Sequence, residues 1–166
     1  GVRSTRLWLF QGFAPGITYE ADQMVFAPSV TNDVDAAMET AAANGIDDMT
    51  ITLFNHDLTD GVTEEDGVEK GEKAHLFADP YQREMLLGLT TDLVRHIYEK
   101  AGELGIEVKI EVMNEPRVIK DTRYNLEAEG KAEEAAEIVE YETFVSDFML
   151  PVARQVREAG GTSVIS

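Results

Sequence analysis

Apolar and polar residues alternate in three stretches of the chain, and a period of two is typical of β-strands. The stretches are Arg3 to Phe10, Met49 to Phe54 and Glu107 to Met113. A fourth, short strand is predicted at Thr162 to Ser166, after the breaker Gly160-Gly161. One row of each of the first three strands is aliphatic, formed respectively by Leu7 and Leu9, by Met49, Ile51 and Leu53, and by Val108, Ile110 and Val112.

Helical spacing of apolar residues fills the intervals between these strands. The first predicted helix is capped by Thr31 or Asn32 and runs to about Asn44, with Gly45 as its stop. The second begins at Asp79-Pro80, a capping residue followed by proline at the first helical position, and ends at Leu104 before Gly105.

The remaining segments are predicted as two long loops and one interrupted helix. Residues 11–28 and 55–78 contain many glycines, prolines and acids, which favour loops. After Pro116 we expect a polar loop and then a helix from about Gly130 to Ala159, which Pro151 should kink or divide. Strands and helices therefore alternate, which predicts a parallel sheet with right-handed crossovers.

The second row of each strand decides between a barrel and an open sheet. Central strands of a doubly wound sheet are apolar on both faces because helices cover both. Here the second rows are polar or aromatic, and no glycine-rich phosphate loop follows the first strand. They comprise Arg6, Trp8 and Phe10, then Thr50, Thr52, Phe54 and His56, then Lys109, Glu111, Met113 and, by extrapolation, Glu115.

These rows suit the interior of a barrel, in which a charge such as Glu111 needs a partner such as Arg6. A complete TIM (β/α)8 barrel needs about 250 residues. The sequence thus predicts an α/β fold of TIM-barrel type, of which residues 1–166, as a single partial domain, form about half: four parallel strands and three helices.

The composition limits the partners that this fold can have. The 166 residues include 14 basic and 32 acidic side chains, a formal charge of −18, which disfavours nucleic acid and anionic membranes. Such acidity is typical of a heavily solvated surface or a high-salt proteome. No cysteine is present, so disulfides and thiolate metal sites are excluded. Neither a membrane-spanning run nor a secretory signal is recognisable.

The chemistry is concentrated where the third strand ends, at Asn114-Glu115-Pro116, with Glu111 three residues earlier. This arrangement resembles clan A of the glycoside hydrolases, retaining enzymes that include the family 5 cellulases and mannanases. In that clan the motif ends the fourth barrel strand, an arginine lies on the second, and a histidine often follows the third. Arg6 and His56 occupy those places here, so the resemblance spans strands two to five.

The resemblance implies a role for each matching residue. Glu115 is the general acid/base, Asn114 binds the sugar 2-hydroxyl, and Arg6 supports the nucleophile. His56 would contact substrate, although Asn55 could take that place. Trp8 is expected either to pack in the barrel interior or to stack on a sugar ring.

The clan's nucleophilic glutamate ends strand seven, which this chain does not reach, and Asp57, the nearest carboxylate at a neighbouring strand end, is the substitute to test. The function expected from the resemblance is therefore hydrolysis of β-glycosidic bonds in a polysaccharide or oligosaccharide. The alternative is an inactive half-barrel that binds carbohydrate or is a structural fragment. Secretion is implied by the resemblance alone.

No cofactor or metal is expected, because the acids of the second long loop lack the spacing of a calcium site and are predicted to be solvated. The two outer strands should expose unpaired backbone groups. They should also leave apolar side chains of the second rows partly uncovered, namely Trp8, Phe10, Phe54 and Met113. We therefore expect the isolated chain to self-associate through its open sheet edges or to be marginally folded.

Overall fold

A four-stranded parallel sheet is the centre of the computed structural model, which describes residues 3–10, 16–20, 23–55 and 77–164. Its strands lie in the order β1 (Ser4–Phe10), β4 (Asp48–Phe54), β5 (Glu107–Met113) and β6 (Thr162–Val164). Both the α/β class and the parallel sheet predicted from the sequence are confirmed.

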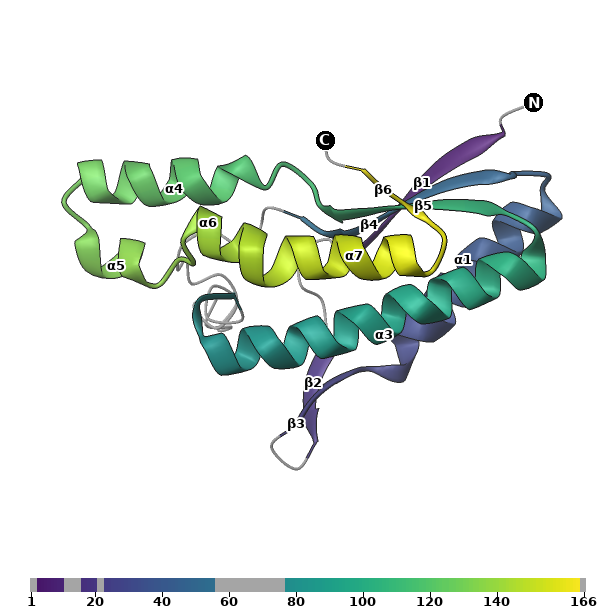
Figure 1. Ribbon diagram of the computed structural model, residues 1–166, viewed down its shortest axis with the longest axis horizontal. Helices are drawn as coiled ribbons and strands as arrows, with labels where there is room; N and C mark the ends of the chain where they lie inside the picture. Colours follow the sequence, from purple (N-terminus) through teal and green to yellow (C-terminus); the bar gives the residue numbers. More distant parts are fainter. Residues whose placement is uncertain (1–2, 11–15, 21–22, 56–76, 165–166) are drawn as a thin grey trace, which may run out of the picture.

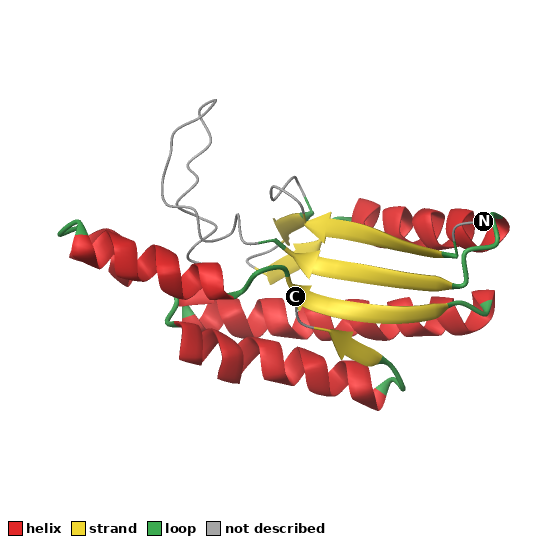
Figure 2. Cartoon of the chain, turned by 90° about the horizontal axis from the view of Figure 1, so that it is seen from above, coloured by secondary structure: helices red, strands yellow, loops and turns green. Residues whose placement is uncertain are grey.

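Three helices lie on one face of this sheet, as Figure 1 shows, namely α1 (Pro28–Ala43), α3 (Pro80–Leu104) and α7 (Leu150–Glu158). Seen from above, the strands lie over these helices, and no described helix covers the face toward the viewer (Figure 2). The aliphatic rows of the strands face the helices. Arg6, Thr52 and Glu111 of the second rows lie on the open face, whereas Phe10, Phe54 and Met113, at the ends of these rows, are part of the buried core.

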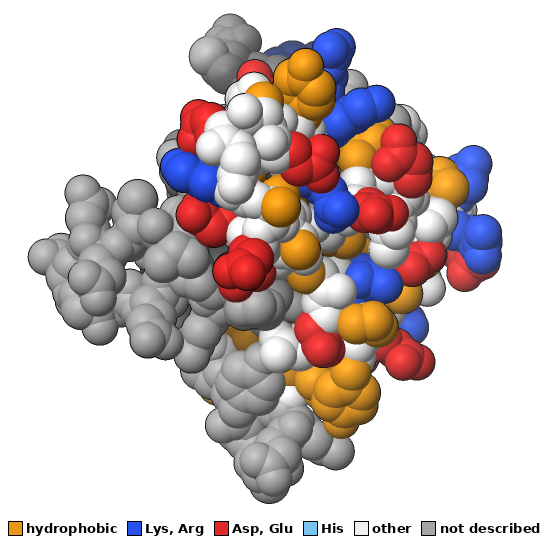
Figure 3. Space-filling view, turned by 90° about the vertical axis from the view of Figure 1, so that its left-hand side faces the viewer, with side chains coloured by type: hydrophobic (Ala, Val, Ile, Leu, Met, Phe, Trp, Pro, Cys, Tyr) orange, Lys and Arg blue, Asp and Glu red, His pale blue; other side chains and the backbone are white. Residues whose placement is uncertain are grey.

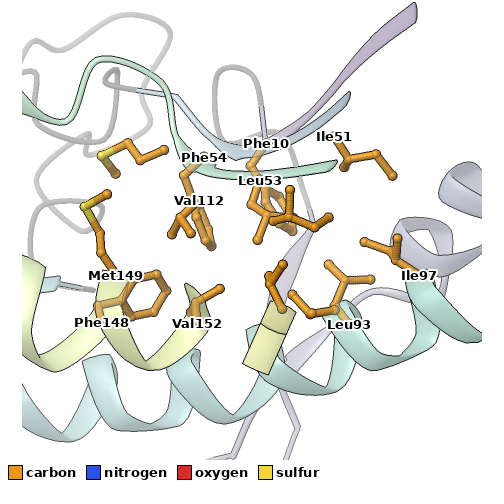
Figure 4. Close-up of a cluster of buried hydrophobic side chains, with 14 of the residues drawn as sticks. Phe10, Ile51, Leu53, Phe54, Leu93, Ile97, Val112, Phe148, Met149 and Val152 are labelled. Atoms are coloured by element: carbon orange, nitrogen blue, oxygen red, sulfur yellow. The ribbon is translucent and has the colours of Figure 1, made fainter. Parts of the chain in front are cut away.

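The core forms where the aliphatic rows meet the helices. Ile51 of β4 and Val112 of β5 are almost fully buried, as are Leu93 and Ile97 of α3 and Val152 of α7, and they lie in one cluster (Figure 4). Burying one such side chain is worth about 1.5–3 kcal/mol. Helix packing on one sheet face thus provides the main stabilisation.

The second helix forms as its end signals predict. The Asp79 carboxylate accepts a hydrogen bond of 2.8 Å from the Gln82 amide, and Gly105 closes the helix at a φ of 67°. The first helix begins earlier than predicted, because Pro28 rather than Thr31 or Asn32 starts it. Thr31 instead donates its hydroxyl to the Pro28 carbonyl at 3.2 Å, inside the first turn.

Two segments predicted as loops contain regular structure. Residues 11–28 include an antiparallel hairpin of β2 (Ile17–Glu20) and β3 (Gln23–Phe26). The segment after Pro116 is the helix α4 (Arg117–Ala128), of which only Ile119 is buried. Polar composition therefore concealed a helix that makes few core contacts.

The long helix predicted for 130–159 is divided. It comprises α5 (Ala132–Ala136), α6 (Tyr141–Phe144), the π-helical turn η3 (Val145–Met149) and α7. The break lies at residues 137–140 rather than at Pro151, which stands in the first turn of α7 directly after the π-helical turn in a stretch that stays helical from α6 onward. A proline cannot donate a backbone hydrogen bond, and a widened turn accommodates this loss.

The prediction of partly uncovered apolar side chains is confirmed for Trp8, which is partly exposed, and is wrong for the other three residues. Phe10, Phe54 and Met113 are buried, with exposed fractions of 5%, 1% and 0%. Phe54 stacks on Phe10 at 5.2 Å between ring centroids and meets Phe148 edge-on at 5.6 Å. The rings join the core cluster beneath the sheet (Figure 4), so the hairpin and the π-helical turn supply a cover that the strand pattern could not reveal.

Candidate functional site

A hydrogen-bonded network joins the three longest strands on the open face of the sheet. The Nε of Arg6, on β1, donates to the Thr52 hydroxyl on β4 at 2.9 Å. That hydroxyl donates in turn to Oε2 of Glu111, on β5, at 2.6 Å. Nη2 of Arg6 donates to the same carboxylate oxygen and completes an ion pair. The predicted pairing of Arg6 with Glu111 is therefore confirmed.

The strand register explains why these side chains meet. Thr52 lies opposite Glu111 on one side and opposite Trp8 on the other, while Arg6 lies one row lower on the same face of β1. The Arg6 side chain is 38% exposed, whereas that of Glu111 is 2% exposed. A carboxylate removed from water requires a charged partner and further hydrogen bonds. Glu111 receives the hydrogen bond from Thr52 on the adjacent strand β4 and the charge from Arg6 on β1, the strand beyond β4.

Asn114 extends this network past the end of β5. Its Oδ1 accepts a hydrogen bond of 3.3 Å from Nη2 of Arg6, and its Nδ2 donates to Oδ1 of Asn55 at 3.4 Å. Asn55 directly follows β4 and is buried. Two predicted site residues, Arg6 and Asn114, are therefore in direct contact, although 108 positions separate them in the sequence.

Glu115 follows Asn114 with an exposed side chain and a left-handed backbone. Its φ of 50° is the only positive value at a non-glycine residue in the described part of the chain. Such a conformation costs of order 1–3 kcal/mol and is common at functional sites. β5 ends at Met113, so the strand alternation cannot be extrapolated to Glu115. Pro116 then leads directly into α4.

Trp8 contributes to the network through its ring. The guanidinium carbon of Arg6 lies 4.3 Å from the ring centroid, a cation–π contact. One face of the indole is therefore used by Arg6. Trp8 therefore lies beside the network, and both interior packing and sugar stacking stay predictions for it.

The two residues considered for the position after the third barrel strand differ in what the structure describes. Asn55 contacts Asn114, whereas His56 lies outside the described residues, as do Asp57 and the acids considered for calcium. Thr52 was not among the predicted site residues. Its sequence carries no signal of this role, because threonine is common in strands; the contacts with Arg6 and Glu111 identify it.

Elsewhere on the described surface, charges are paired locally. On the open face, Lys109 binds both carboxylate oxygens of Asp48 at 2.9 Å. Acidic and basic side chains are interspersed at the end of the molecule where α4 and α5 lie (Figure 3), and Arg123 of α4 pairs with Glu127 at 3.4 Å. The Arg6 network differs because it includes a buried carboxylate.

Other kinds of site find no support in the described residues. No group of three or more histidines and acids among them is placed to hold a metal ion. No helix within the same part of the chain combines the length and apolar character needed to cross a membrane. Comparisons of the chain with protein-family models, with curated proteins and with solved structures find no match.

Proposed function

We propose that this chain carries the acid/base half of a retaining glycoside hydrolase site that cleaves β-glycosidic bonds in a cellulose- or mannan-like glycan. The observation that carries the proposal is the contact of Arg6 with both Glu111 and Asn114, directly before Glu115. These residues come from the ends or open faces of adjacent parallel strands. Sites in parallel α/β folds form at the carboxyl ends of strands.

We further propose that the sheet is half of a (β/α)8 barrel. Four parallel strands with helices on one face and a polar row on the other support this assignment. A doubly wound sheet would need helices on both faces and apolar strands between them. The Arg6 network would then lie in the barrel interior.

In this proposal Glu115 protonates the glycosidic oxygen of the leaving group and later removes a proton from the attacking water. Asn114 donates its amide to a sugar hydroxyl beside the scissile bond. A retaining mechanism also needs a second carboxylate about 5 Å from the first, which attacks the anomeric carbon. Glu111 does not suit that role, because Arg6 and Thr52 both bind its Oε2.

A second candidate function follows from this last point. The same network can hold a sugar without cleaving it, because no described carboxylate is assigned as the nucleophile. The chain would then be an inactive half-barrel that binds carbohydrate or serves a structural role.

Paired activity and binding assays distinguish the two functions. The chain is incubated with β-mannan, cellulose or xylan, and reducing ends are measured; binding to the same glycans is measured by affinity electrophoresis. Release of reducing ends that Glu115→Gln abolishes supports the enzyme. Glu107→Gln, at the other end of β5, is the matched control and should leave activity unchanged. Glycan retardation without hydrolysis supports the binding module. The absence of both hydrolysis and retardation would contradict both functions.

A further inference from the structure

The buried hydroxyl of Thr52 has an arrangement that strand packing does not require. Thr52 lies in β4, between β1 and β5, and is 1% exposed. Its oxygen accepts the Nε–H of Arg6 and donates its own hydrogen to Glu111. Valine has nearly the same shape and suits a strand equally well. The hydroxyl therefore contributes hydrogen bonding rather than packing.

These contacts determine the plane of the Arg6 guanidinium. Nε is held by Thr52, Nη2 is held by Glu111, and the group lies over the ring of Trp8. A guanidinium is a rigid planar fork with five N–H donors, so fixing Nε and Nη2 fixes all its directions. Half-exposed arginines generally retain rotational freedom, which Arg6 loses here.

The fixed guanidinium in turn distinguishes the two ends of the Asn114 amide. Nη2 can only donate, so it selects the Oδ1 end of the amide. On the other side, Asn55 presents its own Oδ1 and accepts from the Nδ2 end. A rotation of the Asn114 amide by half a turn would place two donors against each other and two acceptors against each other. Arg6 and Asn55 therefore select one of the two orientations.

We propose that Thr52 and Glu111 are positioning residues that orient Arg6, and that Arg6 with Asn55 sets the direction in which Asn114 presents its amide. This deepens the proposed function, since Asn114 is the group assigned to the sugar hydroxyl. The orientation itself is a property of the unliganded chain. It can be measured whether or not the chain hydrolyses a glycan.

The test uses the isotopically labelled chain and two pairs of NMR signals. These are the Arg6 Nε–H resonance and the side-chain amide resonances of Asn114, assigned with Arg6→Lys and Asn114→Asp. In Thr52→Val we expect hydrogen exchange at Arg6 Nε–H to accelerate about tenfold or more, the effect of losing one hydrogen bond to a charged group. The Asn114 amide resonances should shift at the same time.

Matched variants separate this effect from a general disturbance of the strand. Thr52→Ser keeps the hydroxyl and should retain the wild-type Arg6 exchange rate. Thr50→Val makes the same substitution at the β4 residue directly opposite Arg6, whose hydroxyl is not part of the network, and should leave the Arg6 Nε–H exchange rate unchanged. Wild-type Arg6 exchange and unshifted Asn114 resonances in Thr52→Val would overturn the proposal.

Glu111→Gln is a second test of the proposal if Thr52→Val fails to fold. It preserves the side-chain shape and removes the charge that holds Nη2, so the proposal again requires faster exchange at Arg6 Nε–H. Wild-type exchange in Glu111→Gln would overturn it. The outcome of the glycan assays bears on the proposed function alone, because neither NMR readout depends on turnover.

Discussion

Gly161→Ala should strongly destabilise the protein, because Tyr98 occupies the space that the new methyl group needs. A Cβ built at Gly161 would lie 2.0 Å from both Cζ and Oη of Tyr98. The ring cannot move away without loss, since its hydroxyl donates to the Val108 carbonyl of β5 at 3.1 Å. Gly161 directly precedes β6, so the clash lies where this edge strand joins the sheet.

The magnitude follows from two contributions. Overfilling a packed site costs about 1–3 kcal/mol, and losing the Tyr98 hydrogen bond adds about 1 kcal/mol. The free energy of unfolding should therefore fall by roughly 2–4 kcal/mol, which lowers the melting temperature by roughly 5–15 °C for a chain of this size. Urea denaturation and differential scanning calorimetry measure the two quantities.

Gly102→Ala is the matched control, because it should have the opposite sign. Gly102 lies in α3, and a Cβ there would meet nothing within 4 Å. Alanine at a helical position stabilises by about 0.5–1 kcal/mol relative to glycine. The reasoning is refuted if Gly161→Ala unfolds within about 0.5 kcal/mol of the wild type while Gly102→Ala behaves as expected.

Three further predictions follow from individual contacts. Burial raises the pKa of Tyr98 to about 12, above its ordinary value of 10.0, so its contribution to stability is fully present below pH 10 and is lost as the pH rises toward 12. The free energy of unfolding of Tyr98→Phe should therefore fall less steeply over this pH range than that of the wild type. Glu115→Gly should stabilise the chain by up to about 1 kcal/mol in urea denaturation by relieving the positive φ, whereas Glu129→Gly, at a φ of −80°, should destabilise it. The edge strands β1 and β6 should let the chain self-associate, and salt should promote this association by screening the net charge of −18. Sedimentation that gives an 18.4 kDa monomer at every ionic strength would contradict the expectation.

The parts of the fold that could be predicted are those with a strong local cause. Alternating aliphatic residues identified the strands, because a half-buried strand must place every second side chain in the core. Asp79 and Gly105 located the ends of α3, because each satisfies backbone groups that the helix leaves unpaired. Neither signal depends on distant parts of the chain.

The parts that could not be predicted depend on contacts with distant segments. The β2–β3 hairpin contributes Phe26, whose ring stacks on Phe10 at 5.3 Å, and no local pattern marks that pairing. The helix α4 is amphipathic, but it is mostly polar and buries only Ile119. Both elements lie in segments whose polar composition favoured loops.

The candidate site could be predicted only where placing a residue in a strand costs free energy unless that residue is paired. A charged side chain in the middle of a strand, such as Arg6 or Glu111, needs a partner in the folded protein, and the register of adjacent parallel strands leaves few choices. Threonine carries no such signal, since it is favoured in strands whether or not its hydroxyl is used. Only the register reveals that Thr52 lies between the two charges.

The position of the helices gives the network its significance. In an open sheet with helices on both faces, a buried Glu111 would face helix side chains, and its partners would come from them. Here Arg6 and Thr52, which bind its carboxylate, come from β1 and β4 of the same sheet, on a face that no described helix covers. Such lateral pairing runs within the sheet and involves no side chain of a described helix. The burial of Glu111 therefore reflects the arrangement of its own sheet, and this makes the Arg6, Thr52 and Asn114 contacts the appropriate targets for mutation.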